Sequence, residues 1–188
     1  MARRRRRFVP PKNDPPLGLD WIEYRYVKRA RRDYDEIKGK FTKIRRDFIT
    51  DIAESEGPKL AALGITAKEI AGMREGIVPE GFAVHHIKPL DSTGGTNDRD
   101  NLVLLPQTPY HDAIHAYLAP QLGSLKVSRG RTVKLPVVKG PVFVPPANDL
   151  AAFAAARRDA WQDRRGDDLP RVAAPKTAPR TDLGGLAP

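Results

Sequence analysis

The residues best suited to chemistry in this sequence are its four histidines, which all lie between His85 and His115. His111 and His115 are four positions apart, so on a helix their imidazoles project from one face, a spacing that suits two ligands of one metal ion. His85 and His86 are adjacent, and successive side chains of a β-strand point to opposite faces. One of this pair can therefore complete a three-histidine metal site while the other faces the adjacent space as a base. The chain has no cysteine, so any metal would be held by nitrogen and oxygen ligands.

The segments around the histidines predict a small strand, loop, strand, helix unit. FAVHHI (82–87) and NLVLL (101–105) are typical of short strands, and the Gly-Gly pair and polar residues between them indicate a loop. Thr108 and Pro109 predict a helix start, with Thr as the cap and Pro at the first position, and the helix runs through Tyr117. Two histidines at helical spacing also fit a pair of exposed surface residues, but the four positions together favour a metal site.

The stretch HHIKPL, the Gly-Gly pair and DNLVLLPQTPYHDAIH together resemble the HNH endonuclease superfamily, which has a ββα-metal fold. The resemblance spans about Phe82–Leu118. It is strongest to the doubled-histidine branch found in colicin- and pyocin-type nuclease domains and related bacterial toxin nucleases. It implies that His86 is the general base and that the metal ligands are His85, His111 and His115.

The resemblance also assigns roles in the loop. It places Asn101, the central N of the family name, in the catalytic site, where it ties the loop to the unit through backbone hydrogen bonds. Gly94–Gly95 would permit backbone conformations that larger residues resist. The sequence departs from the bacteriocin nucleases at Ala83, where they carry a Glu that orients a catalytic Arg. Arg74 and Arg99 are candidates for that Arg on proximity in sequence alone.

The resemblance implies hydrolysis of phosphodiester bonds in DNA with one divalent metal ion. A neutral imidazole on His86 would take a proton from the attacking water, and the metal would stabilise the charge on the phosphate and the departing oxygen. Zn, Ni, Co, Mn and Mg all stay open as the ion. No base-reading element is evident, so contacts to the phosphate backbone, little sequence specificity and strong salt dependence are expected. RNA stays open as a substrate, because the site acts on a phosphate and not on a sugar.

The positive charge of the chain is concentrated at one end. The net charge is +10, and residues 1–50 carry 16 of the Lys and Arg residues against 7 Asp and Glu. Such a block favours a polyanionic partner, above all nucleic acid, although a solvated helix face or docking to another acidic partner also fits. The predicted nucleic-acid contacts are Arg3, Arg4, Arg5, Arg6, Arg7, Lys28, Arg29, Arg31 and Arg32.

The remaining sequence predicts an α+β fold in which a long basic helix precedes the ββα-metal core, and irregular β-hairpins and a C-terminal helix follow it. The long helix would run from Asp20 to about Ser55, because apolar residues recur at spacings of three and four from Val27 to Phe48. A second helix is expected over Ala67–Arg74, because Thr66 and Glu69 have capping-box spacing. The expected units are a flexible basic arm (1–19), a helical basic region (20–76), the HNH core (77–122), a β-rich wrap with the C-terminal helix (123–165) and a disordered tail (166–188).

Two functional classes fit this organisation. The first is an active nuclease, either a phage or mobile-element enzyme or an antibacterial effector with an immunity protein. The second is a non-catalytic structural or adaptor protein of a virion or secretion assembly, in which the HNH fold is a metal-stapled binding module. A candidate base at His86 favours the nuclease, because a staple does not need one. We expect no signal peptide, because no apolar run follows MARRRRRFVPP. We also expect no membrane partner and a cytoplasmic site of action.

Overall fold

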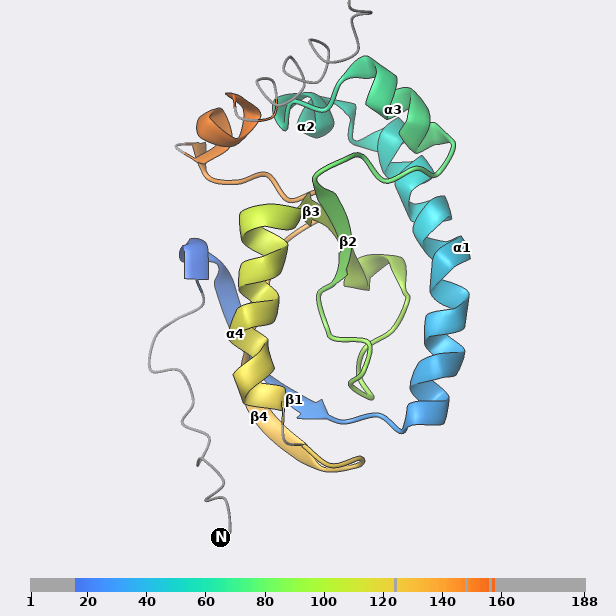
Figure 1. Ribbon diagram of the computed structural model, residues 1–188, viewed down its shortest axis with the longest axis vertical. Coiled ribbons are helices and arrows are strands. Elements are labelled where there is room, and N and C mark those ends of the chain that lie inside the picture. The colour runs from blue at the N-terminus through green and yellow to red at the C-terminus, as the bar shows by residue number, and fades with distance from the viewer. Residues whose placement is uncertain (1–15, 124, 148, 156, 158–188) are drawn as a thin grey trace, which may run out of the picture.

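The structure is a computed structural model, and it describes residues 16–123, 125–147, 149–155 and 157. Helices and two small antiparallel sheets form a mixed α+β fold, as the sequence predicts (Figure 1). The described strands and helices are β1 (Asp20–Val27), α1 (Arg31–Ser55), α2 (Gly57–Ala62), α3 (Ala67–Arg74), β2 (Phe82–His86), β3 (Leu102–Pro106), α4 (Asp112–Leu122) and β4 (Gly130–Val137). None of the described helices is long and apolar enough to cross a bilayer.

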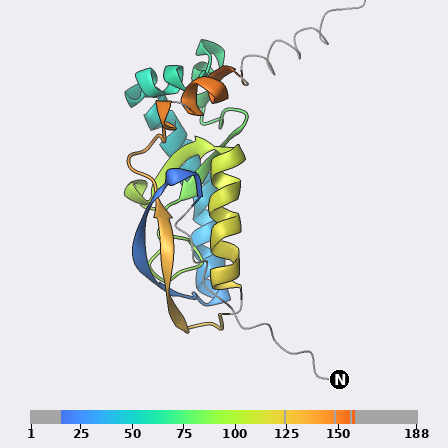
Figure 2. The same ribbon diagram turned by 90° about the vertical axis from the view of Figure 1, so that its left-hand side faces the viewer.

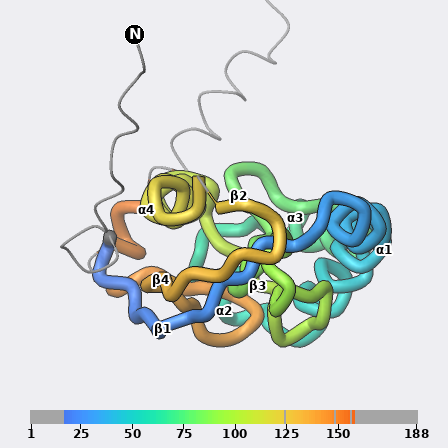
Figure 3. The backbone as a smooth tube through the Cα atoms, turned by 90° about the horizontal axis from the view of Figure 1, so that it is seen from below, coloured from blue at the N-terminus to red at the C-terminus, as the bar shows by residue number. Residues whose placement is uncertain are grey.

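The central unit is the predicted pair of strands followed by a helix. β2 and β3 pair antiparallel, with His85 opposite Val103 and His86 opposite Leu102. Figures 1 and 3 show α4 on one side of this hairpin and α1 on the other, so both helices flank the loop that leaves β2. The histidine-bearing strand is therefore enclosed between two helices from distant parts of the sequence.

The first part of the predicted long helix is wrong, because Asp20–Val27 is a strand. It pairs antiparallel with β4 along its whole length, from Asp20 opposite Val137 to Val27 opposite Gly130 (Figure 2). The physical reason is its content of aromatic and β-branched residues, which favour a pleated surface. The same pairing corrects the predicted β-hairpins after the core, since β4 pairs with a strand from the other end of the described chain.

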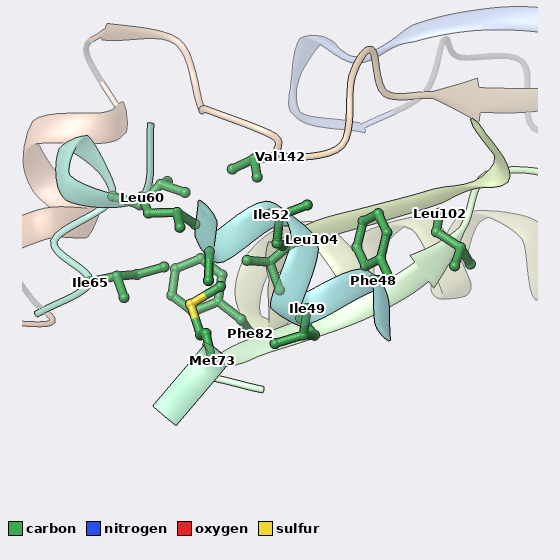
Figure 4. Close-up of a cluster of buried hydrophobic side chains, with 12 residues drawn as sticks. Phe48, Ile49, Ile52, Leu60, Ile65, Met73, Phe82, Leu102, Leu104 and Val142 are labelled. Atoms are coloured by element: carbon green, nitrogen blue, oxygen red, sulfur yellow. The ribbon is translucent and has the colours of Figure 1, made fainter. Parts of the chain in front are cut away.

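The two hydrophobic cores share the strand β3. Its residues are buried on both faces, and alternate side chains point to opposite sides. Leu102 and Leu104 join a cluster with Phe48 and Ile52 of α1 (Figure 4). The other face of β3 contributes to a second cluster, whose buried members are Leu19, Val103, Leu105, Tyr110, Ile114, Leu118, Leu135 and Val138. The C-terminal half of α1 therefore packs within the chain.

The helix boundaries agree with the sequence in one case and differ in another. α3 begins with the predicted capping box, in which Thr66 and Glu69 exchange hydrogen bonds. The predicted start at Thr108 and Pro109 lies inside a π-helical turn (Gln107–His111) that precedes α4, and Thr108 itself has extended backbone (φ −117°, ψ 135°). The hydroxyl of Thr108 instead donates to the Asp112 carboxylate (2.7 Å). The turn leads into α4 and carries His111 at its end.

The ends of the chain are described only in part. Residues 16–18 form a 3-10 turn, and Leu19 is buried, so the last residues of the predicted basic arm are packed against the fold. Residues 147, 149–155 and 157 are helical, and the ring of Phe153 contacts that of Phe82 edge-on, with ring centres 5.7 Å apart. The rest of the arm (1–15), the end of the predicted C-terminal helix and the predicted disordered tail (166–188) lie outside the described residues.

Candidate metal centre and active site

Three of the four histidines converge as the spacing predicts. One imidazole nitrogen from each of His85, His111 and His115 lies within 4.8 Å of the others, and the Nε2 atoms of His111 and His115 are 3.1 Å apart. Two nitrogens bound to one tetrahedral Zn²⁺ at the usual bond length would be about 3.3 Å apart. The donor set and its spacing therefore fit a single divalent ion with open positions for water or substrate.

His85 is the buried member of the triad. Its side chain sits on β2 with only 6% of the residue exposed. Burial, followed by the charge that protonated His115 and His111 would carry, lowers the pKa of His85 to about 3. Burial likewise lowers the pKa of His115. A neutral imidazole is the form that binds metal, so the environment keeps the lone pair of His85 available.

The orientation of His111 depends on neighbours that the sequence analysis missed. Its Nδ1 atom, on the ring edge away from the other histidines, lies 2.9 Å from Gln107 Nε2 and 3.6 Å from Asp112 Oδ1. Hydrogen bonds from Thr108 and Gln107 lower the pKa of Asp112, so this carboxyl is ionised. Polar groups behind a histidine ligand hold its ring in place. The only signal in the sequence was the position of Gln107 and Asp112 beside His111 on the helical path.

The fourth histidine, His86, faces away from the triad and is held by Asn97. Its Nε2 atom lies 2.9 Å from Asn97 Oδ1, and Asn97 Nδ2 donates to the carbonyl of Ile37 (2.8 Å). Because that second bond fixes the amide orientation, Oδ1 accepts from Nε2–H, and the lone pair of the neutral ring is on Nδ1. The Phe41 ring packs against the imidazole at 4.5 Å, and burial lowers the pKa of His86 despite the bond to Asn97. Asn97 carried no recognisable motif in the sequence.

Asn101 ties together the two ends of the loop that leaves β2. Its Oδ1 accepts from the backbone N–H of Lys88 (2.7 Å), and its Nδ2 donates to the carbonyls of Lys88 (3.0 Å) and Thr96 (2.8 Å). A side chain at Gly95 would have its Cβ 2.0 Å from the carbonyl oxygen of Pro89, so only glycine fits this close approach. Asn101 therefore has the loop-holding contacts expected of it, and it reaches the chemistry only through the loop.

Arg29, predicted to contact nucleic acid, has its guanidinium turned into the same loop. Its Nε donates to the carbonyl of Leu90 (3.0 Å), and its Nη2 donates to the carbonyls of Ser92 (2.7 Å) and Gly95 (2.5 Å). The backbone N–H of Arg29 also donates to Asp91 (2.7 Å). These donors are committed to the loop, so we reinterpret Arg29 as a residue that positions it. The sequence offered no signal for this role beyond a basic residue before a helix.

Replacing Arg29 with alanine is expected to lower the free energy of unfolding by about 2–4 kcal/mol, because several buried carbonyls lose a charged donor. Arg32→Ala is the matched control, since Arg32 is exposed and carries the same charge; it should change stability by less than about 0.5 kcal/mol. Urea unfolding followed by circular dichroism measures both values. Equal stability of the two variants would contradict the loop-positioning role of Arg29.

A cleft of about 830 Å³ lies between α1 and α4 and contains all four histidines. Of the predicted nucleic-acid contacts, Lys28, Arg29 and Arg31 line it and Arg32 does not. Lys38 also lines the cleft and is not among the predicted contacts, because charge alone does not show which basic residues of α1 face the cleft. Arg3–Arg7 lie outside the described residues.

Neither candidate for a catalytic arginine lines this cleft. Arg99 forms an ion pair with Asp51 on α1. Arg74 lines a separate hollow together with Arg46 and Glu75. The structure thus brings together the triad, His86 and basic residues of the β1–α1 segment, and leaves both arginines elsewhere.

The comparison with protein families agrees with this geometry. Residues 72–107 match the family described as HNH endonuclease, so the chain carries a domain of the HNH superfamily. The matched segment contains His85, His86 and Asn101, and His111 and His115 follow it directly in the structure. An HNH domain is a nuclease domain, so its substrate class is nucleic acid and its typical cofactor is a divalent metal ion.

One relative extends the similarity over more of the chain. The uncharacterized protein YhhZ of Escherichia coli (strain K12) is 31% identical over 132 residues, which cover 70% of this chain and 33% of that protein. The chain thus spans about one third of the length of this relative. No solved structure matches the chain.

Proposed function

We propose that the protein is a metal-dependent endonuclease that hydrolyses phosphodiester bonds in DNA. The observation that carries the proposal is the division of the four histidines: three ring nitrogens converge, while the fourth ring, turned away from them, lines the same cleft and is held by Asn97 with the lone pair on Nδ1. A metal staple alone would need only the first three. The adaptor alternative gives no reason for the hydrogen bond from His86 to Asn97 or for the open cleft beside it.

In the proposed mechanism, His86 Nδ1 takes a proton from the water that attacks the phosphorus. The ring is then an imidazolium, and Asn97 Oδ1 continues to accept from Nε2–H and stabilises that charge. His85, His111 and His115 would hold the metal, which when bound supplies stabilisation for the negative charge on the phosphate and the departing oxygen. An all-nitrogen donor set suits Zn, Ni, Co or Mn, and Mg stays a candidate.

Charge and shape support nucleic acid as the substrate in this cleft. Lys28, Arg31 and Lys38 line the same cleft as the histidines, where they could contact phosphates on either side of the cleaved bond. Contacts to phosphates do not depend on the base sequence, and the binding that they provide weakens as the salt concentration rises. We retain both biological settings, a phage or mobile-element nuclease and an antibacterial effector with an immunity protein, because the same site serves either. Kinship with the colicin and pyocin branch also stays a prediction.

The proposal predicts that the purified protein relaxes supercoiled plasmid only with a divalent metal present. Cleavage should stop in excess EDTA and return when Zn, Ni, Co, Mn or Mg is added back beyond the chelator, and agarose gels measure both. A structured RNA in a parallel reaction tests the second substrate class. Cleavage that persists in EDTA would contradict the metal role, and the absence of cleavage of plasmid, single-stranded DNA and RNA with every metal would contradict the nuclease assignment.

A further inference from the structure

The first turns of α1 present an aromatic and basic wall to the cleft. Arg31, Tyr34, Lys38 and Phe41 are spaced by three, four and three residues, so they share one face of the helix, and all four line the cleft with the histidines. The loop and α4 lie opposite this face of α1 (Figure 1). Phe41 also packs against the first core cluster, whereas Arg31, Tyr34 and Lys38 are not members of it.

Tyr34 differs from the apolar residues further along α1. Phe48, Ile49 and Ile52 are buried, whereas Tyr34 is half-buried and belongs to neither core cluster of the described chain. The Arg31 guanidinium lies 5.7 Å and the Lys38 ammonium 5.5 Å from the centre of its ring. Both cations lie over the ring, so a base that stacks on Tyr34 would displace one of them, which could then contact the adjacent phosphate. Proteins bind unpaired bases by stacking on aromatic rings with cations nearby.

The position of Tyr34 on α1 sets its distance from His86, the proposed general base. Phe41 contacts the ring of His86, and Tyr34 precedes Phe41 by two turns on the same helix face. At 1.5 Å per residue, this separation is about 10 Å along the helix axis. That length places Tyr34 within a few nucleotides of a phosphate attacked beside His86.

We propose that Tyr34 stacks on a nucleobase near the cleaved phosphate and that the site therefore prefers single-stranded nucleic acid. Arg31, which also pairs with Asp35 at the helix surface (2.8 Å), and Lys38 would contact the adjacent phosphates. A base inside a duplex is stacked on both faces and cannot offer one to Tyr34, whereas an unpaired base can. This inference rests on the proposed function, because it names the form of nucleic acid that the same cleft takes.

The test measures binding separately from cleavage. The His86→Ala variant holds uncut substrate, and fluorescence anisotropy follows a labelled single-stranded oligodeoxynucleotide and its duplex in Ni²⁺ buffer. We expect tighter binding of the single strand. Adding Tyr34→Ala should weaken single-strand binding about tenfold or more and duplex binding about twofold or less, because stacking is lost. Tyr34→Phe should retain the preference, and Tyr34→Leu, which keeps apolar bulk without a flat ring, should lose it.

Matched lysine variants separate stacking from charge. Lys38→Ala should weaken both forms and reduce the salt dependence, whereas Lys40→Ala, which removes a lysine paired with Glu36 outside the cleft lining, should have less effect. Equal loss of single strand and duplex in Tyr34→Ala, or no loss, would overturn the stacking role. Selective binding by a protein that cuts no substrate would instead contradict the nuclease proposal alone, and plasmid cleavage without a single-strand preference would contradict this inference alone.

Discussion

Replacing His86 with alanine is expected to abolish plasmid cleavage and to leave metal affinity nearly unchanged. The variant loses the nitrogen that accepts the proton of water, a contribution of about 100-fold or more to the rate of hydrolysis. The triad is untouched, since His86 points to the other side of β2 from His85. Nicking rates under single-turnover conditions and calorimetric titration with Ni²⁺ measure the two effects on the same preparation.

Asn97 provides the graded companion to this variant. Asn97→Ala keeps the imidazole of His86 but removes the acceptor at Nε2, so the tautomer with a free Nδ1 is less favoured and the rate should fall by about tenfold. The ¹⁵N spectrum of the imidazole reports the tautomer directly, a readout that a loss of packing alone would not move. Plasmid nicking retained by His86→Ala would show that the base is another group.

Local signals explain why the centre of the site could be predicted. The alternation of side chains on a strand and the four-residue spacing on a helix predict that one histidine of the adjacent pair joins His111 and His115, and the resemblance to the HNH family identifies that histidine as His85. The Gly-Gly pair marked the loop, and Gly95 sits where a side chain would strike the Pro89 carbonyl. The HNH family match over residues 72–107 confirms the superfamily on the same stretch.

Long-range pairing explains what the sequence could not provide. Val27 continues the three-and-four spacing of α1, but Asp20–Val27 becomes a strand once β4 supplies a partner from far along the chain. Helix periodicity is a local property, and the pairing that overrides it is not. The role of Asn97 could not be predicted for the same reason, because it depends on the carbonyl of Ile37 on α1, which is far from Asn97 in the sequence, as well as on His86.

The number of charged residues predicts a positively charged surface, but it does not predict the role of each basic residue. The cleft is lined by Lys28, Arg29 and Arg31, but the guanidinium of Arg29 donates its hydrogen bonds to backbone carbonyls of the loop. A guanidinium with several fixed donors is suited to such a bridge, whereas a lysine ammonium is a single point charge. Basic residues of one segment therefore divide into loop support and cleft lining only when their partners are known.

Replacing His111 with alanine is expected to remove both metal binding and cleavage, in contrast to His86→Ala. Two remaining histidines would hold a divalent ion far more weakly, because the lost nitrogen is one of three that share the ion. We expect metal affinity to fall by about 100-fold or more, and Gln107→Ala, which leaves every ligand in place, to cost about tenfold. Calorimetric titration with Zn²⁺ and Ni²⁺ measures the affinities.

The two histidine variants together test the division of labour directly. If His111→Ala binds metal as tightly as the parent protein, the triad is not the metal site, whatever its effect on cleavage. If excess metal restores cleavage to Gln107→Ala but not to His86→Ala, the groups behind His111 act by retaining the ion, and His86 acts on the water. That contrast follows from the placement of His85 and His86 on opposite faces of one strand.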